Sequence, residues 1–457
     1  MTTGDVLGGR LGCVADDYTG GTDVASALRR QGLRTLLLFG PPRPDWAAAD
    51  ADAVVVALKS RNLPPAEAVA VSLAAQRWLR EQGIGRLFFK YCSTFDSTDD
   101  GNIGPVADAL LDAAGSRFTV VCPTSPEHGR TVHQGHLFVG DRLLSESSMR
   151  HHPLTPMTDP DLVRVLGRQT PHRVALVGSE VVRQGPAAVA AAFADLRGQG
   201  ARFAVTDATT DDDLATIAAA SRDLPVVTGA AGLVRLLGAR AHETLTTRRE
   251  APQRRSVADR EISGERLSTA PATGAAEARA AEAGDRGVEG ERLPEGPVLI
   301  LAGSSSAATL DQVARARERF PAYRLDPAAD ADPGDLRAKA VDWMGRHLEG
   351  GTVLVYASAP ASERERAAPG AAKAIELTMA ELARAAVGRG VRRIVVAGGE
   401  TSGAVVDGLG IDRVVVAREE DLGVPWLVTT GPAPLALLLK SGNFGRPDLL
   451  VRAAAAR

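Results

Sequence analysis

The sequence predicts an α/β protein with two domains, each a largely parallel sheet with helices on both faces. Short apolar runs rich in β-branched residues alternate with helix-like segments through both halves of the chain, which is the pattern of βαβ units. The chain has 457 residues, more than one hydrophobic core usually organises. Between the halves, residues 244–295 are mainly Arg, Glu, Ala, Gly, Ser and Thr, without a sustained apolar pattern. We therefore expect an N-terminal domain at 1–243, a flexible linker or insertion at 244–295 and a C-terminal domain at 296–457.

The N-terminal half opens with a βαβ unit. Leu11–Ala15 and Leu33–Phe39 are predicted strands, and Val24–Arg30 is the predicted helix between them. Thr22 or Asp23 is expected at its N-cap, because Thr and Asp side chains accept hydrogen bonds from the free N–H groups of a first turn. The other predicted strands are Ala53–Leu58, Leu87–Lys90, Phe118–Cys122, Val174–Val177, Phe203–Thr206 and Val226–Thr228, and the other predicted helices are Ala66–Gln82, Ile103–Ala114 and Ala187–Arg197.

The C-terminal half starts again with a strand, a polar turn and a helix. Val298–Ala302 is the predicted strand, and a helix follows Gly303–Ser306 and ends near Arg319. Helical periodicity also covers Ala371–Val387. The remaining predicted strands of this half are Thr352–Tyr356, Ile394–Ala397, Val414–Ala417 and Trp426–Val428.

The composition argues against several classes of protein. A net charge of -3 gives no field that would attract nucleic acid or a membrane surface. No apolar run approaches the length of a membrane span, and residues 1–10 lack the pattern of a signal peptide. The three cysteines are scattered, which is typical of a reducing cytoplasm. His128, His133 and His136 lie close together, but glycines interrupt the run and no cysteine completes a ligand set, so no zinc site is predicted at these histidines.

Charged side chains follow several predicted strands of the N-terminal half, where each strand ends. Asp16 and Asp17 follow the first strand, Arg61 follows the third and Lys90 ends the fourth. Ligands bind at the carboxyl ends of parallel strands, so these groups are expected at one edge. Arg61 and Lys90 would pair a carboxylate, the two aspartates would bind hydroxyls, and Asp17 or Asp16 would serve as a general base. Each residue alone also fits an ordinary turn or N-cap, but several such clusters on one edge favour a binding site.

Glycines and hydroxyl side chains follow the predicted strands of the C-terminal half. Gly398–Gly403 comes directly after a buried strand and opens a short helix. A glycine turn before a helix presents backbone N–H groups and about half a positive charge to an anion, although ordinary tight turns of α/β domains share the pattern. Gly303–Ser306 and Ser441–Gly445 are likewise rich in glycine and serine.

The contrast between the two edges predicts a small-molecule kinase with its ligand cleft between the domains. The C-terminal edge suits backbone binding of nucleotide phosphates, with Lys440 and Lys373 as cations and Glu400 holding Mg²⁺ directly or through water. Catalysis in such enzymes is mostly positioning and charge neutralisation. A dehydrogenase is disfavoured because no GxGxxG pattern opens either domain.

Several motifs resemble those of the four-carbon acid sugar kinase family. They occur in one order through both domains, which makes the resemblance specific. One departure is Gly303–Ser306, which reads Gly-Ser-Ser-Ser where the family usually has Gly-Ser-Cys-Ser. The motifs are Ala15–Asp23, Lys59–Arg61, Lys90–Ser97, Gly129–Val132, Gly398–Gly403 and Leu439–Gly445.

The resemblance implies two sites and their ligands. The ligands would be ATP, Mg²⁺ and a small acid sugar, with Asp17 the expected catalytic residue. The acid-sugar site would comprise Asp16, Asp17, Thr19, Arg61, Lys90 and Ser93. The nucleotide site would comprise Ser304, Ser306, Gly398, Gly399, Glu400, Thr401 and Gly442.

One branch of the family matches more closely than the others. Gly135–Asp141, Glu146–Met149 and His152–Asp159 resemble the branch that acts on 3-oxo-tetronates. The implied reaction is ATP-dependent phosphorylation of the 4-hydroxyl of a 3-oxo-tetronate in four-carbon acid sugar catabolism, in the cytoplasm. The alternatives are a D-threonate or D-erythronate 4-kinase, and a non-catalytic acid-sugar sensor on the same scaffold. No nucleic acid or membrane partner is expected, and a homodimer is left open.

Overall fold

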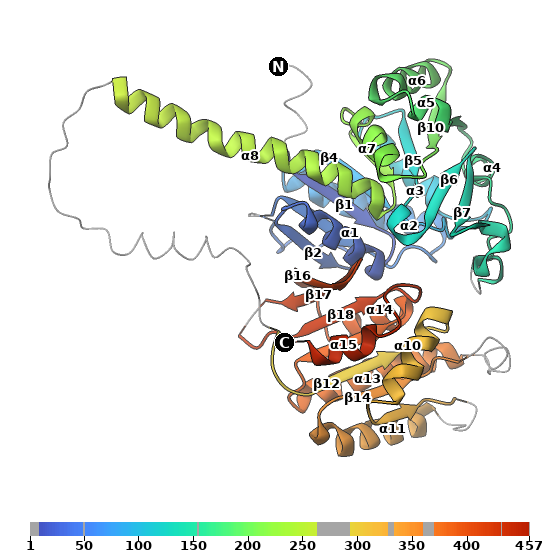
Figure 1. Ribbon diagram of the computed structural model, residues 1–457, viewed down its shortest axis with the longest axis vertical. Coiled ribbons are helices and arrows are strands. Elements are labelled where there is room, and N and C mark those ends of the chain that lie inside the picture. Colours follow the sequence, from blue (N-terminus) through green and yellow to red (C-terminus); the bar gives the residue numbers. More distant parts are fainter. Residues whose placement is uncertain are drawn as a thin grey trace.

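The structure, a computed structural model, describes residues 9–48, 51–152, 155–262, 293–327, 333–359, 370–430 and 432–456. It confirms the predicted α/β class. One large, mostly parallel sheet has helices on both faces, and a small antiparallel sheet lies beside it (Figure 1). No helix among the described residues combines the length and the apolar character that crossing a membrane requires.

The N-terminal strands of the large sheet are all parallel to one another. Their order is β2-β3-β1-β4-β11-β5-β10-β9. Side chains of successive residues point to opposite faces of the sheet, and each face packs against its own apolar layer. A parallel sheet covered by helices on both faces requires this arrangement. The strands are β1 (Leu11–Ala15), β2 (Thr35–Phe39), β3 (Ala53–Ala57), β4 (Arg86–Lys90), β5 (Thr119–Cys122), β9 (Arg173–Val177), β10 (Ala201–Thr206) and β11 (Val226–Gly229).

Helices cover both faces of these strands. One face packs against α1 (Tyr18–Arg30), α6 (Pro186–Gly198), α7 (Asp211–Ala220) and α8 (Ala231–Ile262). The other packs against α2 (Pro65–Glu81), α3 (Ile103–Ala113) and α4 (Leu162–Gly167). The small sheet, which the sequence did not predict, is β6 (Arg130–His133), β7 (His136–Val139) and β8 (Arg142–Leu143). Short helices lie at α5 (Ser179–Val182), η2 (Pro126–His128), η3 (Leu144–Glu146) and η4 (Ser148–His151).

Helix α1 begins at Tyr18 and not at Val24, so the predicted start was wrong. Its N-cap is Asp17, and not Thr22 or Asp23, because the Asp17 carboxylate accepts from the Gly20 N–H at 3.0 Å. Gly20 and Gly21 lie inside the helix, where space is lacking. A Cβ at Gly20 would lie 2.2 Å from Lys90 Nζ, so Gly20 marks close packing rather than a turn.

The C-terminal half has the same layered arrangement. Helices α11 (Pro333–His347), α13 (Ala371–Gly388) and α14 (Gly399–Gly408) cover one face, and α10 (Ala307–Arg317) and α15 (Leu449–Ala455) cover the other. A short helix, η5 (Leu348–Gly350), precedes β14. The strands are β12 (Val298–Ala302), β13 (Ala322–Arg324), β14 (Val353–Tyr356), β15 (Arg393–Ala397), β16 (Arg413–Asp421), β17 (Val424–Thr429) and β18 (Ala436–Lys440). The sequence predicted neither β13 nor β18.

The two halves share one sheet, because β16 pairs antiparallel with β2. Pairs β16–β17 and β17–β18 are also antiparallel, so the parallel strands of the two halves formally run in opposite directions. In the sheet order, six pairings of neighbouring strands lie between β1 and β15. A twist of about 20–25° per pairing turns β15 by well over a right angle relative to β1. This twist accounts for the contacts, described below, between the carboxyl ends of strands from both halves.

The predicted linker at 244–295 begins as helix. Helix α8 continues to Ile262 and extends beyond the body of the molecule (Figure 1). Ala, Arg and Glu are strong helix formers, so a segment rich in them can extend a helix without apolar periodicity. Residues 263–292 lie outside the described residues. The division at 1–243, 244–295 and 296–457 stays a prediction.

Candidate functional site

A charged cluster at the carboxyl ends of β1, β3 and β4 consists of Asp16, Asp17, Arg61 and Lys90. Arg61 binds Asp16 with two parallel hydrogen bonds, Nε to Oδ2 and Nη2 to Oδ1, both 2.8 Å. The same Nη2 donates to Asp17 Oδ1 at 2.6 Å. Lys90 Nζ lies 3.8 Å from that oxygen. Four side chains that the sequence placed at one edge therefore meet in one ion-pair network.

The two aspartates of the charged cluster differ in acidity. Burial raises the pKa of Asp16, against the lowering effect of Arg61. Burial also acts to raise the pKa of Asp17, but Arg61, Lys90 and hydrogen bonds from Thr19 and Gly20 together lower it to about 2. Asp17 is thus a fixed anion at neutral pH, placed to hold a hydroxyl by accepting its hydrogen bond.

The cations of the charged cluster stay protonated. Burial acts to lower the pKa of Lys90, but Asp17 and Asp16 raise it above its ordinary value. The two aspartates likewise hold the pKa of Arg61 well above its ordinary range, against burial. Two cations and two carboxylates give no net charge, so an acidic ligand would have to displace a carboxylate contact or use donors left free.

Two predicted hydroxyl residues lie beside the charged cluster. Thr19 Oγ1 donates to Asp17 Oδ2 at 2.7 Å. Ser93 follows β4 and is half-buried, and its hydroxyl has no hydrogen-bond partner among the described residues. Ser93 is therefore available to a ligand, whereas Thr19 already orients the carboxylate.

The three polar turns of the C-terminal half interlock in one glycine cluster, defined as Gly303–Ser306, Gly398–Gly403 and Ser441–Gly445. Ser306 caps α10 and its hydroxyl also donates to the Gly442 carbonyl. A Cβ at Gly442 would lie 2.3 Å from Ser304 Oγ, and one at Gly303 would lie 2.0 Å from Thr401 Oγ1. The predicted nucleotide residues are thus brought together, and the glycines allow the backbones to approach.

Helix α14 starts within the glycine cluster. Gly398 is its N-cap at φ 130°, without a side-chain cap, so N–H groups of the first turn stay free to bind an anion. Glu400, in that turn, is exposed and accepts from Asn62 Nδ2 at 3.3 Å. Among the described residues no three His, Cys, Asp or Glu side chains gather at metal-binding distance. Glu400 fits a Mg²⁺ ion only as one ligand beside nucleotide phosphates.

The charged cluster and the glycine cluster touch. A Cβ built at Gly399 would lie 3.7 Å from Thr19 Oγ1 and 4.0 Å from Asp17 Oδ2. Asp407 of α14, which sequence reasoning missed, ties the halves together beside this point. It accepts from Tyr18 Oη at 3.0 Å and from Lys59 Nζ at 2.6 Å. No local pattern marks Asp407, because its partners lie more than 300 residues away.

The two lysines predicted beside the phosphates have different environments. Lys440 is fully buried behind the Gly442 turn and donates to Thr309, Gln312 and the Gly442 carbonyl. Lys373 is exposed on α13 and pairs with Glu376 at 3.2 Å. The structure thus associates Lys440, and not Lys373, with the glycine cluster.

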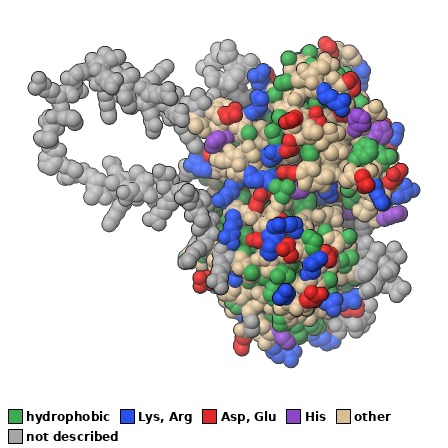
Figure 2. Space-filling view, viewed as in Figure 1, with side chains coloured by type: hydrophobic (Ala, Val, Ile, Leu, Met, Phe, Trp, Pro, Cys, Tyr) green, Lys and Arg blue, Asp and Glu red, His purple; other side chains and the backbone are tan. Residues whose placement is uncertain are grey.

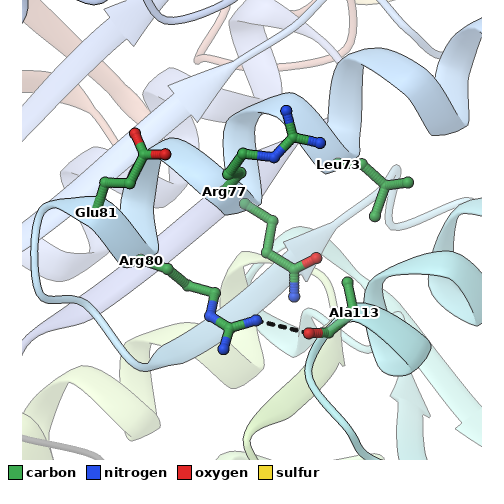
Figure 3. A pocket seen from close by; sticks show the side chains of 6 residues that line it. Leu73, Arg77, Arg80, Glu81 and Ala113 are labelled. Carbon is green, nitrogen blue, oxygen red and sulfur yellow. Dashed lines mark hydrogen bonds between the residues drawn. The ribbon is translucent and has the colours of Figure 1, made fainter.

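A hollow of about 420 Å³ is lined by residues of α2 and α3, among them Arg77 and Arg80 (Figure 3). It lies at the carboxyl ends of these helices, whereas the charged cluster adjoins the start of α2. Acidic and basic side chains are interspersed over the face shown in Figure 2, without a region of one sign.

Replacing Gly398 by Ala is expected to weaken nucleotide binding selectively. The residue would be strained at φ 130°, and its Cβ would lie 3.1 Å from the backbone N of Ser304 in the neighbouring turn. We expect the KM for ATP to rise at least tenfold, equivalent to about 1.4 kcal/mol, with an unchanged KM for the sugar. Gly198→Ala is the control, since a Cβ there meets nothing within 4 Å. Equal KM values for ATP in both variants would contradict the role of the turn.

Two family models together match most of the chain. One, described as a sugar-binding N-terminal domain, matches residues 11–237. The other, described as a nucleotide-binding C-terminal domain, matches residues 299–450. The first contains the charged cluster and the second contains the glycine cluster.

Curated relatives and solved structures match over nearly the full chain. A Burkholderia multivorans protein named 3-oxo-tetronate kinase is 46% identical over 97% of this chain and 96% of its own. A Cupriavidus necator protein of the same name is 46% identical over 96% of this chain and 95% of its own. A Salmonella typhimurium LT2 protein, solved under the provisional description of a tRNA synthase, has a TM-score of 0.79 and 35% identity, covering 97% and 98% of the two chains. A Haemophilus influenzae protein has a TM-score of 0.70 and 36% identity, covering 97% and 99%.

Proposed function

This chain belongs to the four-carbon acid sugar kinase family, and we propose that it transfers the terminal phosphoryl group of ATP to the 4-hydroxyl of a 3-oxo-tetronate. The observation that carries the proposal is the contact between the two clusters. Asp17, in the sugar-binding half, lies 4.0 Å from a Cβ position on Gly399, in the nucleotide-binding half. A hydroxyl bound at Asp17 therefore adjoins the free N–H groups that would hold the transferred phosphoryl group.

The charged cluster binds the acid sugar in this proposal. The carboxylate of the sugar interacts with Arg61 and Lys90, and its hydroxyls bind Asp16 and the free hydroxyl of Ser93. Asp17, held by Thr19 and Gly20, accepts the hydrogen bond of the 4-hydroxyl and orients it for attack. A carboxylate with a pKa of about 2 is a weak base, so proton transfer to it accompanies phosphoryl transfer rather than preceding it.

The glycine cluster binds the nucleotide in this proposal. The N–H groups of Gly399, Glu400 and Thr401 at the start of α14 face the phosphates, and Ser304, Ser306 and Gly442 complete the binding surface. Glu400 would be the protein ligand of Mg²⁺, which supplies charge neutralisation between the phosphates when bound. The reaction would take place in the cytoplasm.

A panel of acids tests the substrate. ADP release is measured with Mg²⁺-ATP and 3-oxo-tetronates made in situ by a dehydrogenase, beside D- and L-threonate and D-erythronate. We expect turnover with the 3-oxo acids and at least a hundredfold lower kcat/KM with the reduced acids, since a pocket that binds a carbonyl disfavours the alcohol. Preference for a reduced acid would assign the chain to a threonate or erythronate kinase. Acid binding without any ADP release would support the sensor instead.

The motif that favoured the 3-oxo branch is only partly described by the structure. Met149 and Met157 are buried, and the Met157 N–H donates to the Met149 carbonyl at 3.0 Å. Residues 153–154, in the middle of the motif, lie outside the described residues. The substrate proposal therefore rests on the relatives and on the two clusters rather than on this segment.

A further inference from the structure

Lys440 is a buried cation without an ion-pair partner in the described part of the chain. Its side chain is fully buried at the end of β18. Nζ donates to Gln312 Oε1 at 2.7 Å, to Thr309 Oγ1 at 2.8 Å and to the Gly442 carbonyl at 3.0 Å. All three acceptors are neutral, and burial lowers the pKa of Lys440 to about 7. An uncompensated buried charge opposes folding, so packing alone does not explain a lysine here.

The contacts of Lys440 hold the last turn of the glycine cluster against α10. The Gly442 carbonyl accepts from Lys440, from Ser306 Oγ and from Thr309 Oγ1, the last at 2.8 Å. Gln312 accepts from the Lys440 ammonium through its side-chain carbonyl, and its amide nitrogen binds the same turn. That nitrogen donates to the carbonyls of Phe444, Gly445 and Arg446 at 3.1, 3.0 and 3.1 Å. Removing the ammonium would therefore loosen both ends of the turn.

The charge of Lys440 also lies next to a turn suited to an anion, 3.0 Å from the Gly442 carbonyl. The turn 441–445 reads Ser-Gly-Asn-Phe-Gly and contains no acidic side chain. Ser304 and Ser306, the hydroxyl residues predicted to bind phosphates, adjoin Gly442 of this turn. A methionine would fill a similar volume without burying a charge, so the charge itself requires an explanation. A phosphate bound at the turn would supply the missing negative charge in a region of low dielectric.

We propose that Lys440 is a positioning residue for the nucleotide. It holds the Gly442 turn in its binding conformation through Thr309 and Gln312, and its buried charge attracts the phosphates through the turn. The inference rests on the proposed function, in which nucleotide phosphates occupy the glycine cluster. Lys440 itself touches neither substrate.

The test compares Lys440→Met with a matched buried cation at the other end of the neighbouring strand. Arg393 begins β15, is buried, and holds the carbonyls of Ala456 and Gly296. Arg393→Met therefore removes a buried cation and its backbone contacts without touching the glycine cluster. ADP binding is measured by calorimetry, KM values for ATP and for the acid sugar by ADP release, and stability by thermal unfolding. Thr309→Val, which removes one hydroxyl of the network, is a milder second variant.

We expect Lys440→Met to weaken ADP binding and raise the KM for ATP at least tenfold, with an unchanged KM for the sugar. Arg393→Met should leave both KM values unchanged, and Thr309→Val should weaken ADP binding severalfold. Unchanged ADP affinity in Lys440→Met, or an equal rise of both KM values, would overturn the inference. If wild-type protein binds ADP but phosphorylates no acid, the substrate proposal fails while the calorimetric comparison still decides the role of Lys440. If wild-type protein binds no ADP, both fail.

Discussion

Asp17→Asn is expected to lower kcat about 10²–10⁴-fold while ADP binds with unchanged affinity. The carboxylate orients the 4-hydroxyl and receives its proton, and an amide can do neither in the same way. Folding should survive, because Asn caps a helix as well as Asp does, and Asp17 is the N-cap of α1. The measurement is steady-state ADP release at saturating ATP and acid, with calorimetry for ADP.

Asp161→Asn is the matched control for this variant. Asp161 caps α4 in the same way, accepting from the Arg164 N–H at 3.1 Å, and lies away from both clusters in the fold. Its kcat and unfolding temperature should equal those of the wild type. Asp17→Asn should still fold but unfold at a lower temperature, since it removes the buried carboxylate that pairs with Arg61 and Lys90. Near-normal kcat in Asp17→Asn would rule out its proposed role and leave it as a helix cap.

Arg61→Met is expected to lower the free energy of unfolding by about 3–5 kcal/mol and to abolish measurable binding of the acid sugar. The change leaves Asp16 buried without the guanidinium that binds both of its oxygens at 2.8 Å. It also removes the cation proposed to bind the sugar carboxylate. Unfolding in urea gives the stability change, and calorimetry with the acid gives the binding.

Two further variants test whether the loss of stability comes from the buried ion pair. Arg346→Met removes an exposed ion pair, 2.8 Å from Asp342, and should change stability little. Asp16→Asn combined with Arg61→Met removes both charges and should recover part of the lost stability, since the penalty comes mainly from an unpaired buried carboxylate. Full stability in Arg61→Met alone would mean that the buried ion pair is not required for folding.

The sequence by itself was sufficient for the α/β class and for the side chains that gather at each edge. Strands such as Leu11–Ala15 are continuous apolar runs, and this local pattern follows directly from burial on both faces of a parallel sheet. Polar residues directly after such runs, like Asp16 and Arg61, must lie at the carboxyl edge. Both predictions depend on residues near one another in the chain.

Features that depend on contacts between residues far apart in the chain became known only from the tertiary structure. The predicted start of α1 at Val24 was wrong, and only the position of Lys90 explains why Gly20 stands inside that helix. The burial of Lys440 and the contacts of Asp407 with Tyr18 and Lys59 were likewise not predictable. These contacts join segments that no short-range periodicity connects.

The sequence alone therefore determined which residues form the two clusters, and the tertiary structure decided that the clusters adjoin. Two separate domains could place the carboxyl edges of their sheets in many relative orientations. Here the pairing of β16 with β2 makes one continuous sheet, and its accumulated twist brings the end of β15 towards the end of β1. The contact of Gly399 with Asp17 and Thr19 is the result, and it depends on long-range strand pairing that local sequence patterns do not encode.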